Sequence, residues 1–84
     1  MFVEYELKKI LEKVLQINEK VQNFERSTGL LESIPELDSM AILEVLTAIE
    51  KKFVIEIHDD DIDVDVFATF GSLVDFIETK ISFS

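Results

Sequence analysis

Few residues of this chain are suited to chemistry, and the most informative is a serine at the predicted start of a helix. Asp38 and Ser39 stand directly before an amphipathic run that reaches Phe53. Side-chain oxygens at such a position accept hydrogen bonds from the backbone N–H groups that the first helical turn leaves unpaired. A phosphodiester attached to Ser39 would also be stabilised by the positive end of the helix dipole. The pattern predicts a helix cap that is also suited to modification by another enzyme.

The same serine is poorly placed to act as a nucleophile. Asp38 is expected to act as a cap and not as a base, so nothing beside Ser39 would activate its hydroxyl. His58 is the only histidine, and no serine or cysteine lies close to it in the sequence, which favours a loop or surface role. We therefore expect the protein not to be an enzyme, and a small hydrolase that uses Ser39 is disfavoured.

Metal and phosphate sites are disfavoured as well. The acidic segment 59–65 suggests a calcium loop, but a loop counted from Asp59 has Val64 where glycine is needed and Phe70 where glutamate is needed. The chain has two glycines, so it lacks a Gly-rich phosphate loop, and it has no cysteine for a disulfide or a thiolate ligand. Any thiol chemistry would therefore have to come from a cofactor.

The composition predicts one small acidic domain over residues 1–84. Hydrophobic residues make up 48% of the chain, enough for a core, and 18 acidic against 8 basic residues give a formal net charge of −10. This charge argues against binding to nucleic acid or an anionic membrane and favours partners with basic patches. The sequence has no apolar run long enough to span a membrane and no signal-peptide pattern, so we expect a cytoplasmic protein and, by default, a monomer.

The elements that would position Ser39 can be read from the hydrophobic spacing. A first helix is expected from its apolar residues three and four apart, namely Val3, Leu7, Ile10, Val14, Ile17 and Val21, widened by Leu11 and Leu15. Periodicity then fails over residues 22–37, a connection rich in turn formers. We expect its own apolar residues to pack it against the core, namely Phe24, Leu30, Leu31, Ile34 and Leu37.

The helix that follows Ser39 has two apolar stripes. At 100° per residue the expected core arc consists of Ile42, Val45, Leu46, Ile49 and Phe53. Met40, Leu43 and Thr47 form a second stripe, flanked by Glu44 and Glu50. Such a stripe is typical of a docking surface, although the connection could equally cover it.

Residues 53–66 are ambiguous because their alternating pattern suits a hairpin as well as a short acidic helix. We favour an extended lead-in and a short helix that begins near Asp59, where aspartates suit the positive end of a helix dipole. Thr69 is expected to cap a final helix with the apolar residues Phe70, Leu73, Val74, Ile77 and Ile81, and with Phe76 on its flank. The predicted fold is an all-α four-helix bundle of three longer helices and a short third one, with a long connection between the first and the second.

The ordered set of these motifs resembles the acyl carrier protein family across essentially the whole chain. The segments that carry the resemblance are Asp38-Ser39-Met40, Leu43-Glu44, Ile49-Glu50-Lys51-Lys52-Phe53, Ile55-Glu56-Ile57, Asp59-Asp60-Asp61-Ile62, Phe67-Ala68-Thr69-Phe70 and Leu73-Val74-Asp75-Phe76-Ile77. The order and spacing of the helices agree with an acyl-carrier bundle.

The resemblance implies a phosphopantetheine-binding carrier domain. Ser39, beside Asp38, would carry 4′-phosphopantetheine, installed by a phosphopantetheinyl transferase, and its thiol would hold an acyl or aminoacyl cargo as a thioester. The pathway would be fatty acid, polyketide or nonribosomal biosynthesis, with an acyl-loading ligase or synthase and downstream acyl-processing enzymes as partners. Partner contacts are implied at Asp38, Met40, Leu43, Glu44, Thr47 and Glu50.

Four departures from the family pattern indicate a diverged, discrete member with a dedicated partner. Pro35-Glu36-Leu37 stands where the family usually has glycine before the Asp-Ser pair, and Met40 replaces the common leucine. Lys51 and Lys52 dilute the acidity of the second helix, and His58 stands where proline is common. The alternative function is an unmodified helical protein-interaction module of the same fold.

Overall fold

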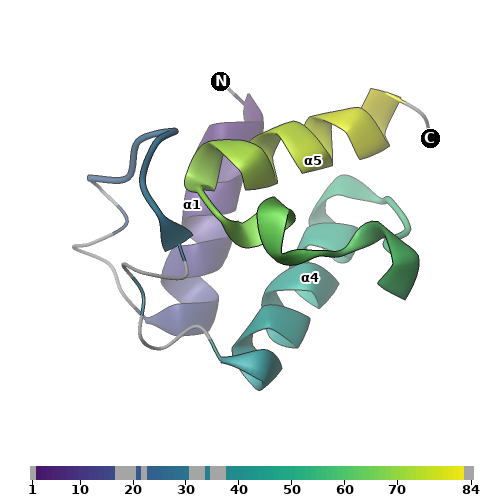
Figure 1. Ribbon diagram of the computed structural model, residues 1–84, viewed down its shortest axis with the longest axis horizontal. Coiled ribbons are helices and arrows are strands. Elements are labelled where there is room, and N and C mark those ends of the chain that lie inside the picture. Colours follow the sequence, from purple (N-terminus) through teal and green to yellow (C-terminus); the bar gives the residue numbers. More distant parts are fainter. Residues whose placement is uncertain (1, 17–20, 22, 31–33, 35–37, 83–84) are drawn as a thin grey trace.

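The structure is a computed structural model that describes residues 2–16, 21, 23–30, 34 and 38–82. Three α-helices dominate these residues: α1 (Phe2–Leu15), α4 (Ser39–Phe53) and α5 (Phe70–Ser82). Two short 3-10 helices, η1 (Asp59–Asp61) and η2 (Val64–Phe67), lie between α4 and α5 (Figure 1). Within the described ranges there is no strand, only an isolated bridge between Gly29 and Thr69. The predicted all-α class is confirmed.

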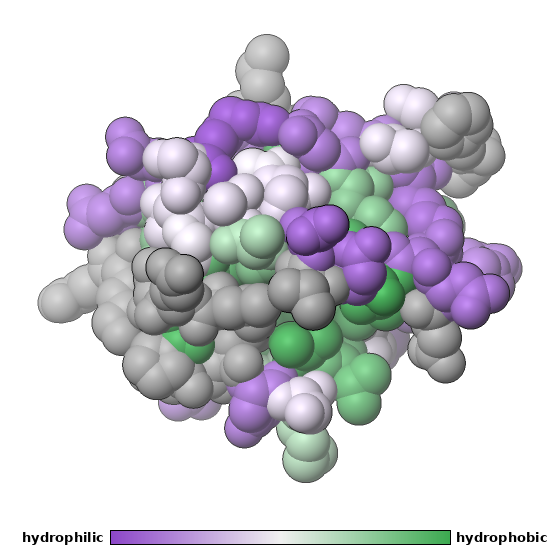
Figure 2. Space-filling view, in the orientation of Figure 1, coloured by the Kyte–Doolittle hydropathy of each residue, from purple (hydrophilic) through white to green (hydrophobic). Residues whose placement is uncertain are grey.

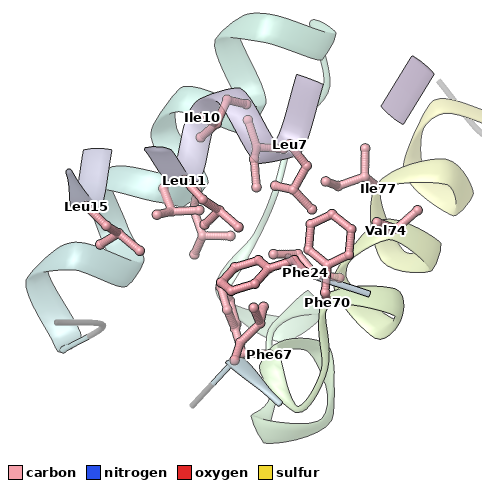
Figure 3. Packing of buried hydrophobic residues seen from close by; sticks show 14 of the residues in the cluster. Leu7, Ile10, Leu11, Leu15, Phe24, Phe67, Phe70, Val74 and Ile77 are labelled. Atoms are coloured by element: carbon pink, nitrogen blue, oxygen red, sulfur yellow. The ribbon is translucent and has the colours of Figure 1, made fainter. Parts of the chain in front are cut away.

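Helix α1 contributes one long face to the core. Leu7, Ile10, Leu11 and Leu15 are buried on this face, and Figure 3 shows Leu7 and Leu11 on the side nearest Phe24 and Phe70. The prediction that this helix continues to Val21 is wrong, because α1 ends at Leu15 and Gln16 has a left-handed backbone with φ of 55°. Such a residue ends a helix. Val21 is nevertheless buried, and Ile17 lies outside the described residues.

The described part of the connection packs against the start of α5. The backbone N–H of Phe70 donates to Thr28 O at 2.8 Å, and that of Gly71 donates to Arg26 O at 2.9 Å. The rings of Phe24 and Phe70 are 5.9 Å apart between centroids and tilted by 57°, a favourable aromatic arrangement. Backbone and side-chain contacts together fix this segment on the bundle.

The expected burial of the connection's apolar residues is confirmed for the members that can be described. Phe24, Leu30 and Ile34 are all buried, whereas Leu31 and Leu37 lie outside the described residues, as does the segment 35–37 before Asp38. The guanidinium of Arg26 adds a polar clamp, with ion pairs to Glu4 on α1 and Asp75 on α5. The connection therefore ties the first helix to the last.

Helix α4 packs its core face against α1. Val45, Leu46 and Ile49 are buried as predicted, and Ala41 joins them. The other two members of the expected arc, Ile42 and Phe53, are only partly buried at its edges. The polar anchor of this packing is the ion pair between Lys52 Nζ and Glu6 Oε1, 3.1 Å apart.

Thr69 caps α5 as predicted, in a reciprocal arrangement with Ser72. The Ser72 N–H donates to Thr69 Oγ1 at 3.0 Å, and the Thr69 N–H donates to Ser72 Oγ at 3.1 Å. The buried face of α5 consists of Phe70, Gly71, Leu73, Val74 and Ile77, while Ile81 is 38% exposed near the end of the helix.

The ambiguous segment between α4 and α5 contains two short helices, and η1 begins at Asp59 as the favoured interpretation predicts. It forms 3-10 turns and not an α-helix, and its aspartates bond locally to the backbone. Asp61 Oδ2 accepts from the His58 N–H at 3.0 Å, and Asp63 Oδ1 accepts from the Val66 N–H at 3.2 Å. Lys80 on α5 donates to the same Asp61 carboxylate at 2.5 Å, which ties η1 to the final helix.

The bond from Lys80 makes the contribution of Asp61 to stability dependent on pH. This bond, with the His58 N–H as a smaller cause, lowers the pKa of Asp61 below its ordinary value of 3.8. A carboxyl whose pKa is lower in the folded state stabilises the fold above its unfolded pKa, and this contribution is lost as the pH falls through the folded pKa. We expect Asp61→Asn to be less stable than the parent near neutral pH, with the difference shrinking below pH 3.8. Urea unfolding of both proteins over this pH range checks the prediction, and a constant difference would contradict it.

Helix α4 ends at a strained residue. Val54 has φ of 55° and ψ of 53°, its side chain is 84% exposed, and its N–H donates to Glu50 O. A left-handed backbone costs roughly 1–2 kcal/mol for a residue with a Cβ atom, and the cost is avoided by glycine. Because the valine side chain buries little surface, we expect Val54→Gly to raise the free energy of unfolding by about 1 kcal/mol.

Denaturant unfolding tests the prediction on Val54, with Val54→Ala as the matched control. Alanine keeps the Cβ atom and should therefore recover little of the strain. Equal effects of the two substitutions, or a loss of stability in Val54→Gly, would show that residue 54 is not strained.

Candidate functional site

The start of α4 is built by Asp38. Its backbone is extended, with φ of −95° and ψ of −174°, and its Oδ1 accepts a hydrogen bond from the Ala41 N–H at 2.9 Å. Its carbonyl oxygen accepts from the Ile42 N–H, also at 2.9 Å. The predicted helix cap is confirmed. Because the Asp38 carboxylate is engaged with the backbone in this way, it is oriented towards the helix end and not as a base for a neighbouring hydroxyl.

Ser39 is the first residue of α4 and is exposed. At this position its hydroxyl stands at the positive end of a helix of 15 residues, where backbone N–H groups favour an attached anion. A shallow apolar hollow of about 400 Å³ lies directly beside it, lined by Ile42, Leu43, Leu46 and, from the segment after η1, Ile62. Figure 2 shows hydrophobic atoms on the surface at the lower edge of the molecule, where α4 begins in Figure 1.

The second stripe of α4 is open to solvent. Met40 is 71% exposed and Leu43 63% exposed, and Thr47 and Glu44 are exposed beside them. We call the three residues Met40, Leu43 and Thr47 the docking stripe. They line one side of a groove that continues to Ala48 and Lys51. The described part of the connection therefore does not cover the docking stripe, which leaves its apolar side chains available to a partner.

Glu50 differs from the other residues that flank the docking stripe. It is half-buried, and its Oε2 accepts a hydrogen bond from the Ile57 N–H at 2.8 Å. This bond holds the chain after α4 against the helix, so the Glu50 carboxylate has a structural role. Helical spacing predicts only that Glu50 flanks the stripe, because the bond to Ile57 depends on how the chain turns back after Val54 and leaves no signal in the sequence.

The remaining titratable candidate, His58, does not line the hollow beside Ser39. His58 is exposed, and its Nε2 lies 3.5 Å from Glu56 Oε2. The part of the chain that can be described holds no group of three or more His, Cys, Asp or Glu side chains arranged to bind a metal ion. None of its helices combines the length and the apolar character needed to cross a membrane.

Comparison with known proteins gives the same family from sequence and from structure, although no family model matches the chain. An acyl carrier protein of Buchnera aphidicola subsp. Schizaphis graminum (strain Sg) is 36% identical over 78 residues, which cover 93% of this chain and 92% of that protein. The solution NMR structure of a holo acyl carrier protein from Nitrosomonas europaea matches with a TM-score of 0.88 and 41% identity, over 98% of both chains.

Both relatives are acyl carrier proteins, which are carriers and not enzymes, and the solved one shares the helical fold over nearly the whole chain. The chain belongs to the acyl carrier protein family. The cofactor of this family is 4′-phosphopantetheine, and the structural relative is a holo form. The resemblance seen in the sequence is thereby confirmed.

Proposed function

We propose that this protein is an acyl carrier whose Ser39 is modified with 4′-phosphopantetheine. The observation that carries the proposal is the exposed position of Ser39 at the first turn of α4, capped by Asp38 and adjoining an apolar hollow. The residues fit the group, because the hydroxyl is accessible and the helix end favours the phosphate. When bound, the cofactor supplies a terminal thiol that holds an acyl or aminoacyl cargo as a thioester. The chain itself has no cysteine to provide one.

The modification is tested by intact mass after incubation with coenzyme A and a broad-specificity phosphopantetheinyl transferase. We expect the parent protein to gain the mass of one phosphopantetheine group and Ser39→Ala to gain none. Ser27→Ala is the matched control, since Ser27 is also exposed but lies in the connection. If Ser39→Ala were modified as fully as the parent, or the parent were not modified at all, the proposal would be wrong. The second outcome would favour an unmodified interaction module.

The hollow beside Ser39 is suited to an acyl chain that folds back from the cofactor. Each buried methylene contributes about 0.8 kcal/mol, so a chain with six buried methylenes would stabilise the loaded protein by at most about 5 kcal/mol, less the cost of opening the hollow. We expect the melting temperature to be higher with an octanoyl than with a butyryl group, and Ile62→Ala to reduce the difference. Thermal unfolding of the two loaded forms measures it. Equal melting temperatures would place the cargo in solvent.

The partners that load and process the cargo would bind the docking stripe. Met40, Leu43 and Thr47 offer the apolar contact, and Asp38 and Glu44 offer acidic groups at its edge. With a net charge of −10, the protein would attract basic patches on a transferase, an acyl-loading ligase or synthase, and later acyl-processing enzymes. We propose that the carrier acts with these enzymes in fatty acid, polyketide or nonribosomal biosynthesis in the cytoplasm.

A further inference from the structure

A basic groove lies between α1 and α4, outside the site described above. Its walls carry Lys9 and Lys13 from α1 and Lys51 and Lys52 from α4, and Val14 and Ala48 lie between them. The chain has 8 basic residues against 18 acidic ones, so half of its positive side chains gather along one groove. We call these four lysines and the surface between them the basic groove.

Only one of these four lysines forms an ion pair within the described part of the molecule. Lys52 pairs with Glu6, the acidic residue in the groove wall, at 3.1 Å. Lys9 Nζ lies over the Tyr5 ring, 4.6 Å from its centroid, which orders the side chain and leaves its charge in place. Lys13 and Lys51 form no ion pair with any carboxylate among the residues that the structure describes. Four lysines therefore line the groove, with Glu6 as the one carboxylate among its described lining residues.

We propose that the basic groove binds an acidic segment of a partner protein, with apolar side chains interspersed among its carboxylates. The carboxylates would pair with the lysines, and the apolar side chains would contact Val14 and Ala48. An extended polyanion such as a nucleic acid or an anionic bilayer fits poorly. Its charge would reach beyond the groove to the acidic remainder of a molecule with a net charge of −10, within a Debye length of about 8 Å.

The basic groove and the docking stripe are neighbours on α4, because Ala48 and Lys51 line both grooves. A partner surface that is basic throughout would be attracted to Glu44 and repelled by the lysines. A partner surface that is basic opposite the docking stripe and acidic opposite the basic groove would be attracted to both. This pattern of charge gives the protein a means of selecting a dedicated partner. Binding in the groove involves neither Ser39 nor a cofactor, so the inference does not depend on the proposed function.

Titration of the ¹⁵N-labelled Ser39→Ala protein with a synthetic peptide of alternating glutamate and leucine tests the proposal by amide chemical shifts. We expect saturable shifts confined to residues 6–14 and 48–52. Lys13→Gln combined with Lys51→Gln removes two exposed charge pairs between the groove and the peptide. The double variant should raise the dissociation constant about tenfold at low salt. The control is Thr79→Glu combined with Ser82→Glu on α5, which lowers the net charge by the same amount and should leave the dissociation constant unchanged.

Several results would overturn the proposal. The first two are the absence of saturable shifts and shifts centred on another face of the molecule. The other two are an equal rise in the dissociation constant in both double variants, and a lysine–leucine peptide that binds in the groove as tightly as the glutamate–leucine peptide. Tighter binding of anionic vesicles or of RNA than of the peptide would also overturn it. If the lysine double variant does not fold, as its own amide spectrum would show, Lys13→Gln alone serves the comparison, with Thr79→Glu as its control.

Discussion

Replacing Phe70 with alanine is expected to remove a large part of the protein's stability. The Phe70 side chain is completely buried, contacts the Phe24 ring, and lies under the Lys8 ammonium, 5.9 Å from the ring centroid. Truncation of a buried phenylalanine to alanine typically costs about 3–5 kcal/mol. A domain of this size has a total stability near the lower end of the usual range of about 5–15 kcal/mol. Much of the Phe70→Ala population should therefore be unfolded at physiological temperature.

Thermal and urea unfolding measure this loss, with Phe76→Ala as the control. Phe76 lies on the same helix but is only partly buried, so the same truncation should cost less than half as much. For a domain of this length each kcal/mol corresponds to about 4–8 °C in melting temperature, so the two variants should be clearly separated. Similar melting temperatures for both would show that Phe70 is not central to the core.

The second large effect is expected at Gly71, where a methyl group has no room. A Cβ atom at this position would lie 2.7 Å from Arg26 O and 2.9 Å from Arg26 Cβ. The connection would have to move away from α5, which would weaken the hydrogen bond from the Gly71 N–H to Arg26 O. Overpacking of this kind costs about 1–3 kcal/mol, so we expect Gly71→Ala to lower the free energy of unfolding by this amount.

The sign of the Gly71→Ala effect distinguishes this close contact from helix propensity. In an unobstructed helix, alanine is more favourable than glycine by up to about 1 kcal/mol. Thr79→Ala, at an exposed position of the same helix, replaces a poorer helix former without a close contact and should therefore stabilise the protein slightly. A more stable Gly71→Ala protein in urea unfolding would mean that the connection yields without cost, and that its contact with α5 does not help to fix the bundle.

Features of the fold that depend on residues close together in the sequence could be predicted from it. Asp38 and Thr69 each bond to a backbone N–H three residues on, within their own chain segment, so their capping follows from residue type and position. The end of α1 could not be predicted, because the apolar spacing continues through Val21 and Gln16 is not a typical residue for a left-handed backbone. Val21 is buried because the core holds it and not because it continues the helix.

The candidate site also has a part that could be predicted from the sequence and a part that could not. Ser39 and the docking stripe lie on one helix, so a helical projection separates them from the core face. The role of Glu50 and the basic groove were missed because each depends on contacts between segments that only the folded chain brings together. Lys9 and Lys13 are far from Lys51 and Lys52 in the sequence, so only the packing of α1 against α4 reveals that their charges share one groove.

The measurement that tests the central claim most directly is the location of the cofactor on the chain. After enzymatic loading from coenzyme A, the protein is digested and its fragments are sequenced by tandem mass spectrometry. We predict that the phosphopantetheine group is found on the fragment that contains Ser39 and on that residue alone, because it is the exposed hydroxyl at the head of α4. Attachment to any other serine, or a loaded protein in which Ser39 is unmodified, would contradict the assignment of Ser39 as the attachment site.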